Sequence, residues 1–260
     1  MAASLDWVPV DTASATSTGH VTLVGGGPGE WDLLTIRGLR ALQAADVILT
    51  DHLGPAEQLA EFVDVGGKEI IDVAKLPYGK QVAQERINQL LVEHALGGRK
   101  VVRLKGGDPY VFGRGYEELA ACDAAGVTCT VVPGVTSAIS VPAAAGIPVT
   151  ERGVNHAFTV VSGHLPPGHP KSLVDWGALA RTGGTIVVVM GVRNVRAIAQ
   201  SLVDAGLAAS TPAAAVQDGE TARQKVVGGT LGSLADDMER AGISSPAVYV
   251  IGEVAARARA

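Results

Sequence analysis

The sequence is poor in aromatic residues and in cysteine. Only 4% of its 260 residues are Phe, Tyr or Trp, although 47% are hydrophobic. Any core must therefore consist mainly of Val, Ile, Leu and Ala, a composition typical of strands covered by helices on both faces. The two cysteines, Cys122 and Cys129, lack the spacing of a metal site, and we interpret them as ordinary buried thiols in a reducing cytoplasm.

Long apolar runs and an excess of positive charge are also missing. No stretch approaches the roughly 18 apolar residues of a membrane-spanning helix, and the N-terminus lacks the basic and apolar regions of a secretion signal. The formal net charge of -5 gives no general attraction to nucleic acid or to anionic lipid. These absences favour a cytoplasmic protein that acts on a small molecule, with no nucleic-acid or membrane partner.

Motifs of several common enzyme classes are absent. Gly25 and Gly27 open a glycine loop, but the third glycine of a dinucleotide-binding motif would fall on Glu30, which would repel a pyrophosphate. The chain has no P-loop and no nucleophile elbow. His164 and His169 lie in a Pro-rich loop without a neighbouring cysteine, a context more typical of a solvated loop than of a metal site. A nicotinamide-dependent oxidoreductase is therefore only an alternative, and no metal is expected.

Apolar runs alternate with amphipathic segments along the first half of the chain. The patterns predict strands at 21–24, 46–50, 69–73, 100–104 and 127–132, and helices from Trp31 onward, over 81–96 and over 114–125. Asp32 is a candidate cap for the first helix. Such alternation is typical of a parallel sheet. Residues 1–19 end in small polar residues and are predicted to be a disordered leader.

The pattern changes after Gly134, where a helix of small residues replaces the amphipathic kind. Further strands are predicted at 157–161, 185–190, 213–217, 225–227 and 248–251, and helices over 192–205 and 233–240, whereas residues 254–260 carry no signal. We therefore expect an α/β protein with an N-terminal domain at 20–134 and a C-terminal domain at 135–260.

Two positions just past predicted strands are candidates for a ligand site. After residues 100–104, Gly106 and Gly107 allow a sharp turn and a close approach of backbone to a ligand, and Pro109 holds Asp108 extended. Open α/β sheets bind ligands at this edge, although an ordinary turn would look the same. Asp51 follows the second strand and is equally compatible with a site residue and with the cap of a helix that begins near Pro55.

An ordered set of short motifs resembles the tetrapyrrole methyltransferases that use S-adenosylmethionine, and the resemblance spans nearly the whole chain after the leader. In chain order the motifs are Val24-Gly-Gly-Gly-Pro-Gly29 with Leu33-Leu-Thr35, Asp51, Arg103-Leu-Lys-Gly-Gly-Asp-Pro-Tyr-Val-Phe-Gly-Arg-Gly115, Pro133-Gly-Val-Thr-Ser-Ala138, Gly146-Ile-Pro-Val-Thr150, Ser162-Gly-His164, Met190-Gly191, Gln217-Asp-Gly219 with Arg223-Gln224, and Ser245-Pro-Ala247. The resemblance implies the two-domain tetrapyrrole methylase fold, with a mixed sheet in the C-terminal domain, an active-site trough between the domains, and a homodimer.

The resemblance also implies a reaction. Methyl groups would pass from S-adenosylmethionine to two ring carbons of uroporphyrinogen III, giving precorrin-2 via precorrin-1 for sirohaem or cobalamin biosynthesis and releasing S-adenosylhomocysteine. No metal is required, because the sulfonium is already an activated methyl donor. The long motif at Arg103–Gly115 favours this reaction over that of a later precorrin C-methyltransferase, the alternative within the family.

Family roles can be carried over residue by residue. The cofactor positions fall on Pro28, Gly106, Gly107, Asp108, Val111, Thr136, Ser137, Met190, Gly219 and Ala247. Most of these are small or apolar, which suits a ligand held by backbone groups, with Asp108 as the one charge among them. The proton acceptor falls on Asp51 and the proton donor on Lys75, with Lys80 as a rival because Ala74-Lys-Leu-Pro-Tyr-Gly-Lys80 departs from the family's pattern. His52 replaces the arginine that the family usually has.

The implied substrate carries many acetate and propionate groups. An acidic protein must meet them with local arginines, whose guanidinium groups bind carboxylates in a bidentate manner. We consider Arg37, Arg114 and Arg152 as candidates, and each is equally compatible with ordinary surface charge.

Overall fold

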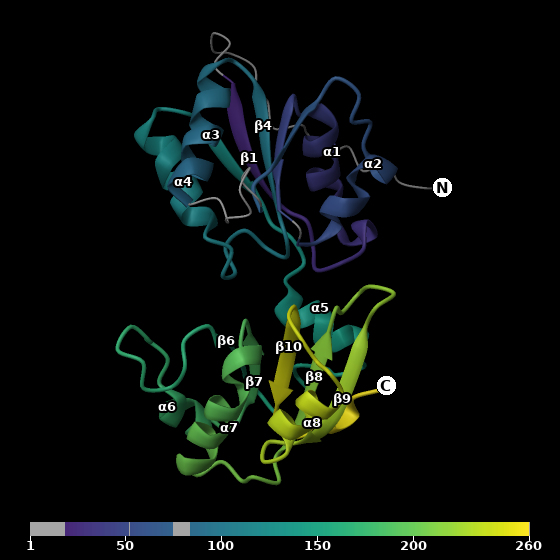
Figure 1. Cartoon of the computed structure of the whole chain (residues 1–260), viewed down its shortest axis with the longest axis vertical. Helices are drawn as coiled ribbons and strands as arrows, with labels where there is room; N and C mark the ends of the chain where they lie inside the picture. The colour runs from purple at the N-terminus through teal and green to yellow at the C-terminus, as the bar shows by residue number, and fades with distance from the viewer. Residues whose placement is uncertain (1–18, 52, 75–83, 260) are drawn as a thin grey trace.

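The computed structural model describes residues 19–51, 53–74 and 84–259. Within these residues the chain forms two α/β domains, each built on a five-stranded sheet. Figure 1 shows the first domain above the second, with α5 (Ser137–Ala144) at the place where the domains meet. None of the described helices combines the length and the apolar character that a bilayer crossing requires.

The first sheet is entirely parallel, as the alternating pattern predicts. Its strands are β1 (His20–Gly25), β2 (Val47–Thr50), β3 (Glu69–Asp72), β4 (Lys100–Lys105) and β5 (Cys129–Val132), in the order β3-β2-β4-β1-β5. Each neighbouring pair is parallel. The helical segments between them are η1 (Trp31–Leu33), α1 (Ile36–Ala44), η2 (Pro55–Gln58), α2 (Leu59–Phe62), α3 (Gln84–Leu96) and α4 (Gly115–Ala124).

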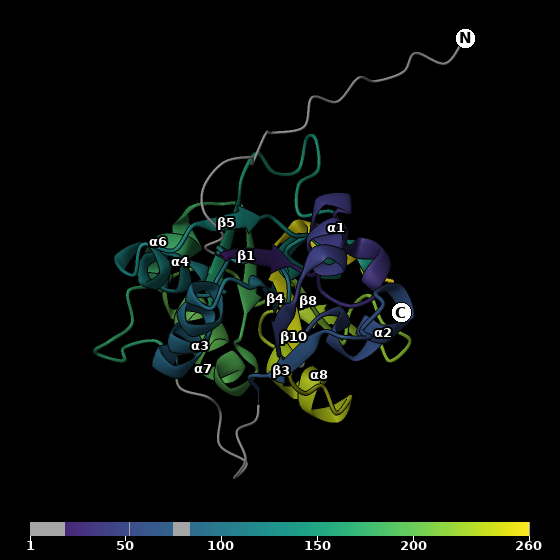
Figure 2. The same cartoon turned by 90° about the horizontal axis from the view of Figure 1, so that it is seen from above.

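The strands β1, β2 and β4 of this sheet are buried on both faces, and their alternate side chains point to different helices. Val21, Leu23 and Val101 pack with residues of α3 and α4. Val24 and Leu104 pack instead with residues of α1 and α2. Figure 2 shows the two helix pairs on opposite sides of β1 and β4. Because successive strand residues alternate between faces, Arg103 and Lys105 share the α3 and α4 face with Val101.

The order of the strands creates a crevice at one edge of the sheet. From β1 the chain crosses toward β2 over the face covered by α1, whereas from β4 it crosses to β5 by way of α4 on the other face. β1 and β4 are neighbours, so the loops that follow them diverge in opposite directions. Open α/β sheets bind ligands at such a switch point, beyond the carboxyl ends of the strands.

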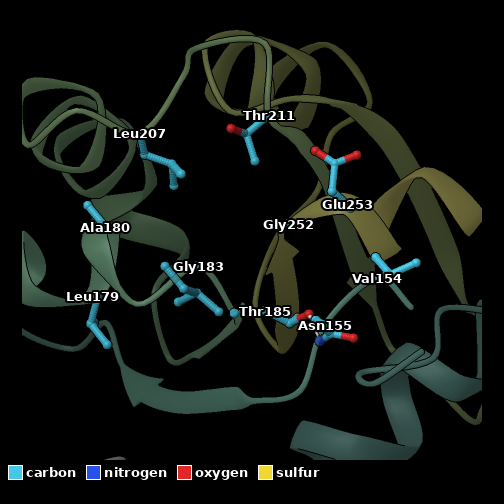
Figure 3. Close-up of a pocket in the computed structure, with 12 residues that line it drawn as sticks. Val154, Asn155, Leu179, Ala180, Gly183, Thr185, Leu207, Thr211, Gly252 and Glu253 are labelled. Atoms are coloured by element: carbon cyan, nitrogen blue, oxygen red, sulfur yellow. Dashed lines mark hydrogen bonds between the residues drawn. The ribbon is translucent and has the colours of Figure 1, made fainter. Parts of the chain in front are cut away.

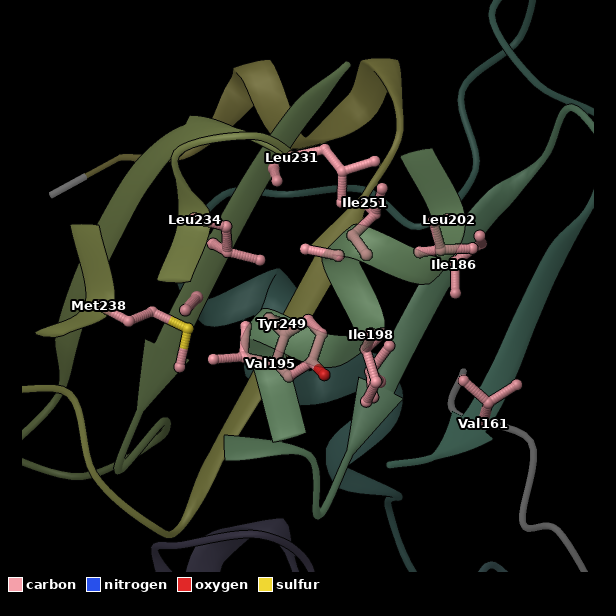
Figure 4. Packing of buried hydrophobic residues seen from close by; sticks show 14 of the residues in the cluster. Val161, Ile186, Val195, Ile198, Leu202, Leu231, Leu234, Met238, Tyr249 and Ile251 are labelled. Atoms are coloured by element: carbon pink, nitrogen blue, oxygen red, sulfur yellow. The ribbon is translucent and has the colours of Figure 1, made fainter. Parts of the chain in front are cut away.

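The second sheet is mixed. Its strands are β6 (Phe158–Ser162), β7 (Thr185–Val189), β8 (Pro212–Gln217), β9 (Lys225–Thr230) and β10 (Ala247–Ile251), in the order β6-β7-β10-β8-β9, and only β6 and β7 are parallel neighbours. α5 and η4 (Glu253–Arg257) cover one face. The other face is covered by α6 (Trp176–Arg181), α7 (Val195–Asp204, preceded by η3, Val192–Asn194) and α8 (Leu234–Arg240). Figure 4 shows Tyr249 of β10 among Val195 and Ile198 of α7 in this core.

The structure differs from the sequence predictions at three segments. α1 begins at Ile36 and is capped by Thr35, whose hydroxyl oxygen accepts a hydrogen bond from the Gly38 N–H at 3.1 Å, so the prediction of Asp32 as the cap was wrong. α6 lies in a stretch where no helix was predicted, because a helix of 6 residues carries little periodicity. The C-terminal stretch forms η4, with Val254 and Ala255 buried against the second sheet.

Candidate active site

Three glycine loops meet at the switch point of the first sheet. Gly27 and Gly107 bond reciprocally, with N to O distances of 3.2 Å and 2.7 Å, and tie the loop after β1 to the loop after β4. The backbone of Gly107 has a φ of +67°, which favours glycine. A Cβ on Gly25 would come within 2.5 Å of the Gly134 backbone in the loop after β5. The glycines that fail to form a dinucleotide motif therefore serve close packing of three loops.

A pocket of about 650 Å³ lies beyond these loops and is lined by both domains. This volume falls within the range of small-molecule sites. The lining includes every residue that the family resemblance assigns to the cofactor: Pro28, Gly106, Gly107, Asp108, Val111, Thr136, Ser137, Met190, Gly219 and Ala247. They come from the loops after β1, β4, β5, β7 and β8 and from the start of β10, so strand ends of the two sheets face one another across the pocket.

The Asp108 carboxylate fastens two of the loops together. Its Oδ1 accepts a hydrogen bond from the Tyr110 N–H at 2.8 Å, and its Oδ2 accepts one from the Gly134 N–H at 2.9 Å. Asp108 is also not the only acidic residue on the wall, because Glu30, Glu57 and Asp218 line the same pocket. A cation in the pocket could therefore meet several carboxylates, and Asp108 has a structural task in addition.

Asp51 follows β2 and lies on the face of the first sheet that α3 and α4 cover, where it meets Arg103. Its Oδ2 pairs with Arg103 Nη2 at 2.9 Å, and its Oδ1 accepts a hydrogen bond from the Leu53 N–H at 3.0 Å. The N-terminal cap of η2 is Gly54, so Asp51 does not cap that helix and the capping alternative was wrong. Leu53 and Gly54 line the pocket, whereas Asp51 does not line it, and one fifth of the Asp51 side chain is exposed.

Some predicted residues lie outside the described part of the chain. Lys75, its rival Lys80 and His52 belong to this group. The proton donor that the resemblance assigns to Lys75 thus stays a prediction.

The arginines nearest the pocket are not those selected from the sequence. Arg37, Arg114 and Arg152 are exposed and do not line the pocket, and Arg114 forms a bidentate ion pair with Glu117 through bonds of 2.7 Å. Arg193 and Arg223 do line it, and neither side chain has an ion-pair partner among the described residues. Arg193 follows the motif Met190-Gly191, and Arg223 itself belongs to the motif Gln217-Asp-Gly219 with Arg223-Gln224, so these motifs were the signal that could have identified both arginines.

A second cavity, of about 130 Å³, lies at the opposite end of β7. Thr185 and Gly252 border it, and Figure 3 shows Asn155 close to Thr185 on its wall. The Asn155 amide is already bonded to Thr185 Oγ1 at 2.7 Å and to three backbone groups. Because the Asn155 amide is fully bonded and the volume is far below that of ordinary ligand sites, this cavity is no rival to the larger pocket. No group of three or more metal-ligating side chains occurs in the part of the chain that the structure describes.

A parallel and a mixed five-stranded sheet, with a pocket between their strand ends, define a two-domain α/β protein built to bind a small molecule. The chain belongs to the tetrapyrrole (corrin/porphyrin) methylase family, whose model matches residues 20–235.

Relatives of this chain have two different lengths. An S-adenosyl-L-methionine-dependent uroporphyrinogen III methyltransferase of Methanosarcina barkeri is 43% identical over 236 residues, covering 91% of this chain and 92% of the relative. A siroheme synthase of Chromobacterium violaceum is 46% identical over 245 residues, covering 94% of this chain and 51% of the synthase. The chain therefore spans about half the length of that synthase. The solved structure of a uroporphyrin-III C-methyltransferase from Thermus thermophilus complexed with S-adenosylhomocysteine is similar with a TM-score of 0.75 and 38% identity, covering 91% of this chain and 98% of that one.

Proposed function

We propose that this chain catalyses the S-adenosylmethionine-dependent C-methylation of uroporphyrinogen III at two ring carbons, giving precorrin-2 via precorrin-1 and releasing S-adenosylhomocysteine. The observation that carries the proposal is the convergence of all the assigned cofactor positions, drawn from both domains, on one pocket of about 650 Å³. The names and lengths of the Methanosarcina and Thermus relatives support the same reaction.

The pocket suits S-adenosylmethionine in shape and chemistry. A Cβ built on Gly107 would meet no atom nearer than Ser137 N at 3.8 Å, so this glycine leaves open space toward the pocket. At Gly106, in contrast, packing requires a glycine, because a Cβ built there would come within 2.5 Å of the Leu53 Cβ. When bound, the cofactor supplies a methyl group on a sulfonium, which an electron-rich pyrrole carbon attacks in line. The protein residues then have to hold donor and acceptor at attack distance and take up protons.

Asp51 is the proposed proton acceptor and Lys75 the proposed donor. Asp51 lies two positions before Leu53, which lines the pocket with Gly54, and contacts with Arg103 and the Leu53 N–H fix the orientation of its carboxylate. A fixed carboxylate can accept a proton that leaves the macrocycle as the alkylated ring is neutralised.

The proposed contacts to substrate carboxylates involve Arg193 and Arg223, which face the pocket from the loops after β7 and β8. Arg37, Arg114 and Arg152 remain candidates for binding the carboxylates of the macrocycle that extend beyond the pocket.

The proposal includes a homodimer as the working unit and the cytoplasm as its place of action. Tyr110, Phe112 and Tyr116 expose large side chains beside the pocket loop, and exposed apolar groups of this kind favour association. Cys122 and Cys129 are free thiols, in line with a reducing compartment.

The decisive experiment is incubation of the purified protein with uroporphyrinogen III and methyl-labelled S-adenosylmethionine, followed by mass analysis. We expect a tetrapyrrole that carries two labelled methyl groups. An unlabelled tetrapyrrole would refute the proposal, and label accepted only by a precorrin would favour a later C-methyltransferase.

A further inference from the structure

Four alternating charges lie in a row between the first sheet and its covering helices. In order they are Asp51, Arg103, Glu118 and Lys105, which we call the buried charge row. Arg103 Nη2 lies 2.9 Å from Asp51 Oδ2, and Arg103 Nε lies 3.3 Å from Glu118 Oε1. Lys105 Nζ completes the row at 2.9 Å from the same Glu118 oxygen. Arg103 thus joins the two carboxylates, and Glu118 joins the two cations.

Strand parity and helix placement bring these groups together. Arg103 and Lys105 are two residues apart in β4 and point to the face that α4 covers with Glu118. The Glu118 side chain is fully buried, and that of Arg103 is only 5% exposed. Asp51, at 20%, is the most exposed member. The row therefore runs from a solvent-accessible carboxylate beside the pocket loop into the interior of the domain.

Stability alone does not account for such an arrangement. Burial and the neighbouring guanidinium of Arg103 lower the pKa of Lys105, which means that the protein disfavours its charged form. Glu118 Oε1 accepts from Arg103, Lys105 and also Gln84, while Glu118 Oε2 is buried without a hydrogen-bond partner among the described residues. Apolar side chains of similar volume often replace buried ion networks without loss of stability.

The row is also unsuited to carrying protons away from Asp51. Arg103 stands between the two carboxylates, and a guanidinium does not lose its proton in a protein. A proton accepted by Asp51 must therefore leave on its exposed side. The row can instead hold the Arg103 guanidinium in one orientation. Arg103 Nε donates to Glu118, and Arg103 Nη1 donates to the Leu104 carbonyl oxygen at 2.7 Å, so that Nη2 points at Asp51.

We propose that Glu118 is a positioning residue that acts through Arg103 to orient the Asp51 carboxylate for proton transfer, while Lys105 balances the buried charge of Glu118. This inference rests on the proposed role of Asp51. It assigns a function in the reaction to a helix residue that does not line the pocket.

The test replaces both inner members of the row by apolar residues of similar volume, in the double variant Glu118→Leu/Lys105→Met. The buried charge stays balanced, because the Asp51 and Arg103 pair remains, yet Arg103 Nε loses its acceptor. With both substrates saturating, we expect kcat to fall at least about tenfold, since a displacement of about 1 Å at a reacting group can cost about a hundredfold. The affinity for S-adenosylhomocysteine, measured by calorimetry, should stay within about twofold of wild type. If the variant does not fold, Glu118→Met/Lys105→Met takes its place, because it also removes the acceptor of Arg103 Nε.

A crystal structure of the same variant separates positioning from a purely structural role. We expect the Arg103 Nη2 to Asp51 Oδ2 contact, 2.9 Å in the native chain, to be lost. A kcat within about twofold of wild type, or an unchanged contact, would overturn the inference. If the wild-type protein fails to methylate uroporphyrinogen III, the proposed function is at fault, and the crystal structure still decides whether Glu118 places Asp51. Glu93→Gln, which removes an exposed carboxylate paired with Arg86 on α3, is the matched control and should alter neither readout.

Discussion

At the scale of single residues, the proposed chemistry depends most on Asp51. Its two oxygens have separate partners, Arg103 and the Leu53 N–H, and Leu53 lines the pocket. The Asp51 side chain therefore closes a local turn by accepting from the Leu53 N–H, and it also presents a carboxylate next to a pocket-lining residue. These two tasks can be separated by substitution, because asparagine can accept the same backbone hydrogen bond but cannot take up a proton.

We expect Asp51→Asn to lower turnover by roughly 10²–10⁴-fold, the range that general base catalysis contributes. The free energy of unfolding should also fall, because the substitution removes the charge that pairs with the buried Arg103, whereas the affinity for S-adenosylhomocysteine should match wild type. Steady-state kinetics with both substrates saturating, beside a binding titration, measure these effects. Asp64→Asn is the control, because Asp64 Oδ1 makes the same kind of turn with the Gly66 N–H at 2.9 Å on an exposed loop. Turnover of Asp51→Asn within a few-fold of wild type would remove Asp51 from the mechanism.

Gly107→Val should abolish cofactor binding while the fold persists. The φ of +67° at Gly107 is unfavourable for valine, at a cost of about 1–2 kcal/mol for a left-handed backbone, and the new side chain would project into the pocket. Gly126→Val is a matched control, because Gly126 has a φ of +68° and no atom within 4 Å of a built Cβ.

Circular dichroism and calorimetry with S-adenosylhomocysteine distinguish backbone strain from obstruction of the pocket. The two glycine variants should lose similar stability, and only Gly107→Val should lose affinity. Equal affinities in both variants would place Gly107 outside the binding site.

At the scale of secondary-structure elements, helix ends and strand ends decide where the site forms. The cap of α1 is an example, since Thr35 rather than Asp32 fixes the start of the helix that follows the first glycine loop. Thr35→Ala should therefore cost about 1 kcal/mol of stability, and Asp32→Ala should be nearly silent. Chemical denaturation of both variants measures the difference. Equal destabilisation by the two substitutions would contradict the assignment of the cap.

The loops after β7 and β8 bring Arg193 and Arg223 to the pocket. If these side chains bind substrate carboxylates, Arg193→Gln and Arg223→Gln should each raise KM for uroporphyrinogen III by about tenfold or more, because hydrogen bonds to charged groups contribute about 1.5–3 kcal/mol. The value of kcat and the affinity for S-adenosylhomocysteine should remain near wild type. Arg181→Gln, at the exposed end of α6, serves as the control. An unchanged KM in both variants would exclude these two arginines and return attention to Arg37, Arg114 and Arg152.

At the scale of the whole molecule, the pocket is shared between domains, so a ligand that fills it contacts both. Binding to the folded state alone raises the free energy of unfolding, by about 2.7 kcal/mol at a concentration of 100 Kd. We expect S-adenosylhomocysteine to raise Tm with no added metal, and EDTA to leave both the shift and the methylation activity intact. A shift that disappears with EDTA and returns with a divalent ion would contradict a metal-free mechanism.

The sequence by itself determined the strands, because short β-branched and apolar runs such as 100–104 and 185–190, bounded by glycines or polar residues, favour strands. It also determined the alternation of strand and helix, and hence a parallel first sheet. The short elements α6 and η4 were missed, because their residues follow no long period and are ordered only by packing on the second sheet. The ordered motifs selected ten residues that line the pocket as cofactor positions, but not the pocket-lining arginines.

Tertiary structure alone decided which charges meet. Arg103 and Glu118 are separated in sequence by a glycine-rich turn and part of a helix, and nothing in their spacing predicts a buried ion pair. The same holds for Asp51, whose partner lies 52 positions away on a neighbouring strand. Periodicity reports which face a side chain occupies, whereas contacts between elements depend on strand order and on the register of helices against the sheet. For that reason the arginines that line the pocket are Arg193 and Arg223 rather than those selected from the sequence. For the same reason only the structure identified Glu118 as a residue that can act on Asp51 from the interior.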